Sequence, residues 1–247
     1  MSKKIFKKGK LVDLLLHVPH CGDVFASIPD KELPSIFSKL VKSKRLHAVG
    51  LVRGDNTSLW LEAIARLEEL DILVIPVVQV NLDILNCKKF TFSCFLPPDE
   101  PEQSTTEFIR RFEALTSLNF SSKMQALVDL VELSSGFILP TKVDLTPASL
   151  QCVPVLHADW GFNTFDIVYQ ETKEHLKRLL GGKKYQIVAC SDAVLLSQIA
   201  SRTISVSEGS ITFASLRALV KGKNSRLKYS INLQPTGVFR EKFHANL

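Results

Sequence analysis

The stretch ILVIPVVQV, residues 72–80, is apolar at every position except Gln79. A continuous apolar run of this length indicates a strand that is buried on both faces, as strands inside a parallel sheet are. Two earlier stretches, KLVDLLLHV at 10–18 and LHAVGLV at 46–52, have the same character. These three runs therefore predict the first strands of one buried sheet.

Helical patterns alternate with such strands along most of the chain. Further strands are expected at 90–96, 136–140, 165–170, 185–191 and 202–206. Helices are expected at 30–43, 57–70, 104–116, 121–135, 172–180, 193–201 and 214–222. The helix at 57–70 has Thr57 or Ser58 as its expected N-cap. Regular alternation of this kind predicts an α/β fold built from βαβ units around a closed or wound, mostly parallel sheet.

Length and composition favour one globular domain, because the chain has 247 residues, of which 45% are hydrophobic and 23% charged. We expect a single domain over residues 11–232 and a tail over 233–247. Five scattered cysteines, odd in number and without a CxxC pair, favour reduced thiols and a cytoplasmic location. No apolar run reaches the length of roughly 18 residues that suggests a membrane span.

The N-terminus, MSKKIFKKGK, carries five lysines in residues 1–10. A solvated basic arm is one interpretation of this charge run. The other is an electrostatic contact with nucleic acid or another anion, although Phe6 is its only aromatic residue.

Polar residues stand where the expected strands end. In barrels of alternating strands and helices, the chemistry lies on loops at the carboxyl ends of the strands. Residues at or just after such ends are His17, Arg53, Gln79, Lys142 and Asp192.

The order of these segments resembles that of the PHP (polymerase and histidinol phosphatase) family, over about residues 11–222. The segments that carry the resemblance are VDLLLHV…CGD, LHAVGLVRGDN, LDILVIPVVQV, KFTFSCFLP, GFILPTKVD, FNTFDIVY and YQIVACSDAV. The resemblance implies a distorted (β/α)7 barrel with mostly parallel strands. It also implies a cleft that holds up to three divalent metals and hydrolyses phosphate esters.

The family's metal-ligand positions are largely changed in this chain. His17 and Asp192 retain a ligating side chain, and Asp55 offers a carboxylate where the family has a histidine. The remaining positions carry residues that ligate metals poorly or not at all: Leu15, Gly54, Gln79, Thr91, Lys142 and Val194.

Lys142 is the sharpest of these changes, because an ammonium repels a divalent cation. We interpret Lys142, together with Arg53, as supplying positive charge where metals would lie, with an ion pair to Asp192 or Asp55. The sequence then predicts an inactive, metal-depleted protein that serves as a binding or interaction module. Its cleft would hold a phosphate-type anion on Arg53 and Lys142, as part of a small molecule or a protein, with no cofactor.

Two alternatives remain open. The first is a metal-dependent phosphoesterase with a reduced site of His17, His20, Asp55 and Asp192 and one divalent manganese, zinc or iron ion. The second is a scaffold subunit whose basic arm docks on a protein or on nucleic acid.

Overall fold

The computed structural model describes residues 9–18, 29–115, 119–223 and 226–233. Within them the chain is mixed α/β, as expected. The strands are β1 Lys10–His17, β2 Leu46–Val52, β3 Leu73–Ile84, β4 Cys87–Phe95, β5 Phe137–Pro140, β6 Thr164–Asp166, β7 Gln186–Val188, β8 Thr203–Glu208 and β9 Lys228–Asn232. The α-helices are α1 Leu33–Ser43, α2 Thr57–Glu68, α3 Pro101–Glu113, α4 Phe120–Leu133, α5 Pro147–Trp160, α6 Thr172–Leu179 and α7 Phe213–Val220. Two short 3-10 helices are η1 Asp30–Glu32 and η2 Leu196–Gln198. Most of the basic arm 1–10 and all but the first residue of the tail 233–247 lie outside the described residues.

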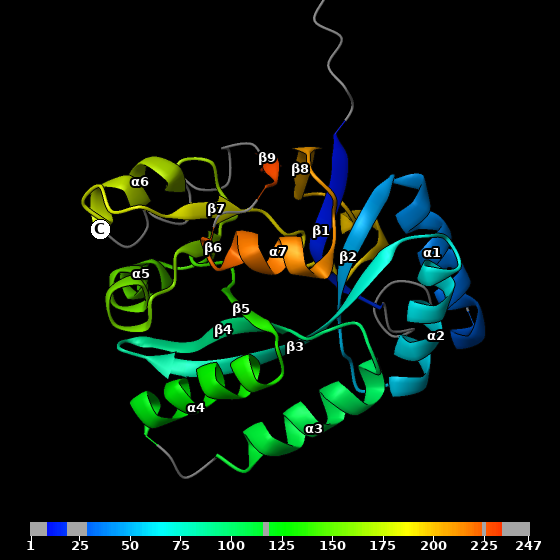
Figure 1. The fold of residues 1–247 in the computed structure, drawn as a ribbon, viewed down its shortest axis with the longest axis horizontal. Coiled ribbons are helices and arrows are strands. Elements are labelled where there is room, and N and C mark those ends of the chain that lie inside the picture. The colour runs from blue at the N-terminus through cyan, green and yellow to red at the C-terminus, as the bar shows by residue number, and fades with distance from the viewer. Residues whose placement is uncertain (1–8, 19–28, 116–118, 224–225, 234–247) are drawn as a thin grey trace, which may run out of the picture.

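The strands form a curled, barrel-like wall with α1–α4 on its outside, while α7 crosses the middle of the view and packs its apolar side chains against those of β1 and β3 (Figure 1). One sheet has the order β5-β4-β3-β2-β1-β8-β9, and β6 and β7 form a separate pair. Backbone hydrogen bonds of the segments next to that pair connect it to the larger sheet on both sides. Val143 N donates to Asp166 O at 3.1 Å, and His17 N donates to Ala193 O at 2.9 Å. The ends of β1, β5, β6 and β7 therefore meet around one interior.

The expectation of mostly parallel strands is wrong for the described residues. The β1–β2, β2–β3 and β6–β7 pairs are parallel, whereas β3–β4, β4–β5, β1–β8 and β8–β9 are antiparallel. The reason is clearest at β3 and β4. Strand β3 ends at Ile84 and β4 begins at Cys87, so only two residues connect them. A connection that short permits only a hairpin, because parallel strands need a crossover of about a dozen residues. Leu85 accommodates the turn with a left-handed φ of 49°.

Other elements differ from expectation for local reasons. Helix α5 was not expected, and it contains Pro154 although proline normally interrupts a helix. The stretch 193–201 contains only the short helix η2 instead of an α-helix. The cap of α2 is Asn56, whose side chain accepts a hydrogen bond from Leu59 N, and neither Thr57 nor Ser58 has that role. Strand β9 was also missed.

The apolar run 72–80, which lies almost entirely in β3, is buried on both faces, as predicted. Ile75 and Val77 pack into the interior cluster together with Leu15 of β1. Val74 packs into the cluster beneath α1 and α2, and Val78 into the cluster beneath α4 and α5. Burying each such side chain stabilises the fold by roughly 1.5–3 kcal/mol, so this strand ties three cores together.

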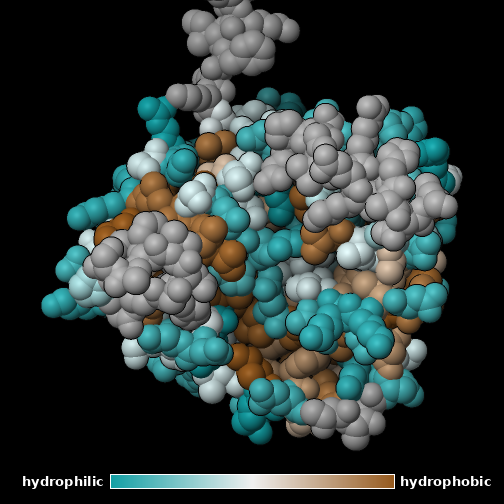
Figure 2. All heavy atoms as spheres, turned by 180° about the vertical axis from the view of Figure 1, so that it is seen from behind, coloured by the Kyte–Doolittle hydropathy of each residue, from teal (hydrophilic) through white to brown (hydrophobic). Residues whose placement is uncertain are grey.

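Seen from behind, the molecule shows brown apolar side chains from its left side to its lower middle, with teal hydrophilic ones between and around them (Figure 2). Large apolar side chains that are exposed include Leu85, Leu133, Leu145, Leu179 and Val194. Scattered exposure of this kind is normal for a folded surface. Within the described part of the chain, none of the helices combines the length and the apolar character needed to cross a bilayer.

Candidate functional site

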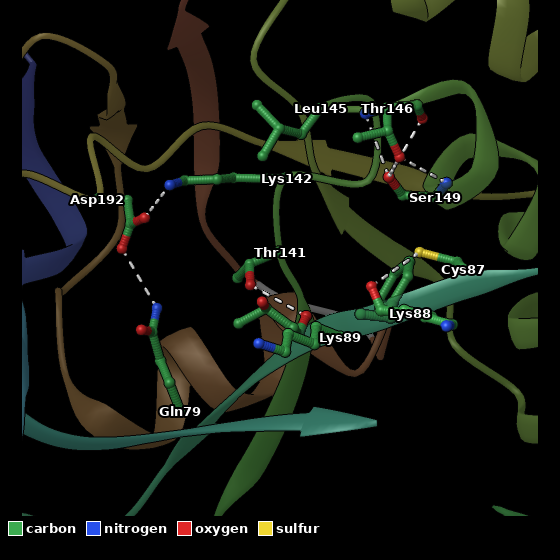
Figure 3. A pocket seen from close by; sticks show the side chains of 12 residues that line it. Gln79, Cys87, Lys88, Lys89, Thr141, Lys142, Leu145, Thr146, Ser149 and Asp192 are labelled. Atoms are coloured by element: carbon green, nitrogen blue, oxygen red, sulfur yellow. Dashed lines mark hydrogen bonds and ion pairs between the residues drawn. The ribbon is translucent and has the colours of Figure 1, made fainter. Parts of the chain in front are cut away.

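A polar cluster centred on Asp192 lies where the ends of β1, β5 and β7 converge beside the middle of β3, because β3 runs on past Gln79 to Ile84 and Gln79 is not at a strand end. Lys142 Nζ makes an ion pair with Asp192 Oδ2. His17 Nε2 lies 2.9 Å from Asp192 Oδ1, and Gln79 Nε2 donates to the same oxygen at 3.2 Å. Figure 3 shows Lys142 and Gln79 approaching the carboxylate from opposite sides. Since an ionised carboxylate only accepts hydrogen bonds, all three neighbours serve as its donors.

Buried Asp13 holds the Asp192 loop against β1. Its carboxylate accepts hydrogen bonds from Ser191 N at 2.9 Å and Ala200 N at 3.2 Å. Ala193 N in turn donates to Leu15 O at 3.3 Å. These bonds fix the residues on both sides of Asp192, and its carboxylate is thereby placed next to His17.

Buried Asp166, at the end of β6, does the same for the Lys142 side of the cluster. It accepts from Lys142 N at 3.0 Å and from Cys190 N at 2.9 Å. Arg202, which is also buried, lies 3.5 Å from it and supplies the compensating charge. Burial raises the pKa of Asp166 to about 6, although Arg202 opposes that rise. One carboxyl therefore joins the two loops that carry Lys142 and Asp192.

Both partners of the central ion pair have a left-handed backbone, with φ of 49° at Lys142 and 46° at Asp192. Such conformations cost non-glycine residues of order 1–3 kcal/mol each, and they concentrate at functional sites. The surrounding hydrogen bonds to Asp13 and Asp166 hold these conformations in place. Two strained residues in direct contact indicate a site that is maintained at a cost in stability.

The cluster keeps Asp192 ionised. Burial by itself would raise the pKa of Asp192, since its side chain is only 12% exposed. The hydrogen bond from His17 and the charge of Lys142 outweigh burial and hold this pKa well below its usual range. Asp192 is thus a permanent anion that is already neutralised by protein donors.

A cleft of about 270 Å³ opens beside Lys142, between the β3–β4 hairpin and the start of α5. Its lining includes three lysines, Lys88, Lys89 and Lys142, and one carboxylate, Asp192. The Lys142 side chain is 32% exposed, so it reaches both Asp192 and the open cleft. An ammonium has three N–H donors, and Asp192 engages only part of that capacity. The cleft is therefore cationic.

The residues of the cluster do not fit a divalent metal. Lys142 already occupies the carboxylate that a cation would need, and Gln79 turns its amide N–H toward that carboxylate. In the part of the chain that the structure describes, no three His, Cys, Asp or Glu side chains gather closely enough to hold a metal ion. His20 lies outside the described residues. Asp55 is exposed in the loop between β2 and α2.

Arg53, the second residue predicted to bind an anion, points toward α3. Its guanidinium donates to Thr105 Oγ1 at 2.6 Å and Thr106 Oγ1 at 2.7 Å, and it lies over the Trp60 ring at 5.9 Å. These contacts join the end of β2 to α2 and α3. The structure thus brings His17, Lys142 and Asp192 together, while Arg53 has its described contacts elsewhere.

Sequence reasoning missed Asp166, Lys88 and Lys89 as parts of the site. Asp166 lies in the segment FDIVY, where a carboxylate within an apolar strand was a usable sign of a buried polar role. Lys88 and Lys89 look like ordinary charged residues between two strands. Only the hairpin, which places them opposite α5, makes them part of the cleft wall.

Comparisons of the sequence with protein-family models and with curated proteins find no match. Among solved structures, PsfC from Pseudomonas syringae is similar, with 11% identity, a TM-score of 0.52, and 96% of each chain covered. A candidate metal-dependent phosphoesterase from Bifidobacterium adolescentis is 13% identical, with a TM-score of 0.44 and coverage of 98% of this chain and 97% of that protein. At such identity the likeness to PsfC supports the overall fold and carries no information on activity.

Proposed function

We propose that this chain is a metal-independent, PHP-like protein that binds a phosphate-type anion in the cleft beside Lys142 and does not hydrolyse it. The ion pair between Lys142 and Asp192 carries the proposal, with His17 and Gln79 on the same carboxylate. A fixed ammonium neutralises this carboxylate, which is the role that a bound cation would otherwise have. No nucleophile-activating metal is then needed or favoured at this position.

The charge balance of the cleft supports an anionic ligand. Lys88 and Lys89 are exposed on the hairpin side, and the lone carboxylate in the lining is already engaged by Lys142. Charge-assisted hydrogen bonds from ammonium groups to phosphate oxygens are among the stronger polar contacts in proteins. Lys88 and Lys89 add positive charge on the hairpin side, so the phosphate group should bind between Lys142 and the hairpin.

Titration calorimetry with inorganic phosphate and with AMP tests this proposal. Lys142→Ala should weaken binding at least about tenfold, which corresponds to about 1.4 kcal/mol. Lys88→Ala, which leaves the Asp192 cluster untouched, should also weaken it, while Lys39→Ala on the exposed side of α1 should not. Arg53→Ala should leave the affinity unchanged, because the Arg53 guanidinium donates its hydrogen bonds to Thr105 and Thr106 of α3. The proposal would be overturned if phosphate and AMP do not bind, or if neither Lys142→Ala nor Lys88→Ala weakens their binding.

Elemental analysis distinguishes this proposal from a reduced-site phosphoesterase. After incubation with manganese, zinc or iron and desalting, the wild-type protein should retain far less than one equivalent of metal. Near-stoichiometric metal that is lost in His17→Ala would support the phosphoesterase instead. The measurement needs no knowledge of the substrate.

A further inference from the structure

Two cysteines lie side by side at the wall of the cleft. Cys87 begins β4 and pairs with Ile84 across the hairpin end, and its side chain lines the cleft. Cys152 projects from α5 onto the same place, with its thiol 3.5 Å from Ile84 O and 3.2 Å from Ala148 O. Because Ile84 is both the cross-hairpin partner of Cys87 and the residue that the Cys152 thiol contacts, the two cysteines lie next to each other at this end of the hairpin.

The two thiols differ in accessibility. Cys87 is 7% exposed and faces the cleft, whereas Cys152 is fully buried behind it. Burial, followed by the neighbouring Cys87, raises the pKa of Cys152 to about 12, which keeps it a thiol. A small oxidant that enters the cleft therefore meets Cys87 first, with Cys152 positioned to resolve the product. Cys94, further along β4, and Cys190, just after β7, are fully buried.

We propose that Cys87 and Cys152 form a redox-active pair that closes to a disulfide when a peroxide oxidises Cys87. The Cys87 thiolate attacks one peroxide oxygen, the O–O bond breaks, and the leaving hydroxide takes up a proton to become water. The Cys152 sulfur then attacks the resulting sulfenic acid, the S–O bond breaks, and a second water leaves with the Cys152 proton. Peroxide accepts the two electrons. An added dithiol then reduces the disulfide back to two thiols by thiol–disulfide exchange and is itself oxidised.

The disulfide would couple redox state to the shape of the cleft. Lys88 and Lys89 directly follow Cys87, so tethering Cys87 to α5 restrains two of the three lysines in the lining. Formation of the bond does not depend on what the cleft binds. The inference can thus hold even if the phosphate proposal fails.

Peptide mapping of the full-length protein tests the pair directly. Each of the five cysteines falls in a different tryptic peptide, so every possible disulfide gives a distinct cross-linked mass. After treatment with hydrogen peroxide and blocking of free thiols, we expect peptides 67–88 and 143–173 to be joined, with loss of two hydrogens. The thermal midpoint should rise on oxidation and return on reduction with dithiothreitol, since a cross-link restricts the unfolded chain.

Matched variants complete the test. Cys87→Ser and Cys152→Ala should each abolish the linked peptide and the shift in midpoint, while Cys94→Ala should retain both. Circular dichroism checks that each variant is folded. The proposal is overturned if peroxide leaves Cys87 unlinked in the folded wild-type protein, or if its partner is Cys21, Cys94 or Cys190.

Discussion

Neutralising Lys142 while keeping its length, as in Lys142→Met, removes the main charge partner of Asp192. At a normal charge-assisted separation of about 2.8 Å, and with an effective dielectric constant of about 20, the pair attracts by roughly 6 kcal/mol. Desolvation offsets much of this, and breaking a fully buried pair costs about 3–5 kcal/mol. Because Lys142 is 32% exposed and His17 and Gln79 remain on Asp192, we expect a loss of about 2 kcal/mol in the free energy of unfolding.

A double-mutant cycle isolates the pair from other effects of the substitutions. Asp192→Asn suits the left-handed backbone at this position, because asparagine tolerates that conformation. Urea unfolding of wild type, both single variants and the double variant at pH 7 should give a coupling energy of about 2 kcal/mol. The exposed pair Arg66–Glu62 at 3.5 Å is the matched control and should give about 0.5 kcal/mol or less. A Lys142–Asp192 coupling as small as that of the control would refute the reasoning.

Two further predictions concern the wall of the barrel. In Gly50→Ala, the new Cβ would lie 1.9 Å from Leu14 O and 2.7 Å from Leu14 C, so β1 must move. We expect a loss of more than about 3 kcal/mol in thermal or urea unfolding, and a loss below about 1 kcal/mol would contradict this contact. Burial raises the pKa of Asp13 from 3.8 to about 7, against the opposing hydrogen bonds from Ser191, Leu15 and Ala200. Asp13 therefore stabilises the folded state fully below pH about 4 and loses this contribution as the pH rises to about 7, a change of up to about 4 kcal/mol. Asp192 has a lowered pKa, so its dependence on pH is opposite. Its contribution to stability is present above the ordinary carboxyl pKa and is lost as the pH falls below that value. Urea unfolding of the wild type and of Asp13→Asn between pH 4 and 7 separates the Asp13 contribution from that of Asp192. Only the wild-type free energy of unfolding should contain the Asp13 contribution, so parallel plots against pH for the two proteins would contradict the prediction.

The sequence by itself determined the strands and helices whose signals are local. Strand β2 was predicted with its exact bounds, and α3, α4 and α6 within a few residues, because apolar period and caps depend on neighbouring residues. The changed metal-ligand positions, which the resemblance implied, stay a prediction. Leu15, which stands where a first histidine was expected, is fully buried in the interior cluster.

The tertiary structure alone decided strand direction and the composition of the site. Strand β4 runs antiparallel to β3 because of the two-residue turn Leu85-Asn86, which is not one of the glycine-containing pairs by which a sequence usually announces a tight hairpin. The ion pair predicted for Lys142 could form with Asp192 or with Asp55, and only the packing of the β5 and β7 ends selected Asp192. Arg53 was separated from Lys142 by its contacts with α3. The contacts of Lys142 and Arg53 join residues about 50 positions apart in the chain, which local patterns do not encode.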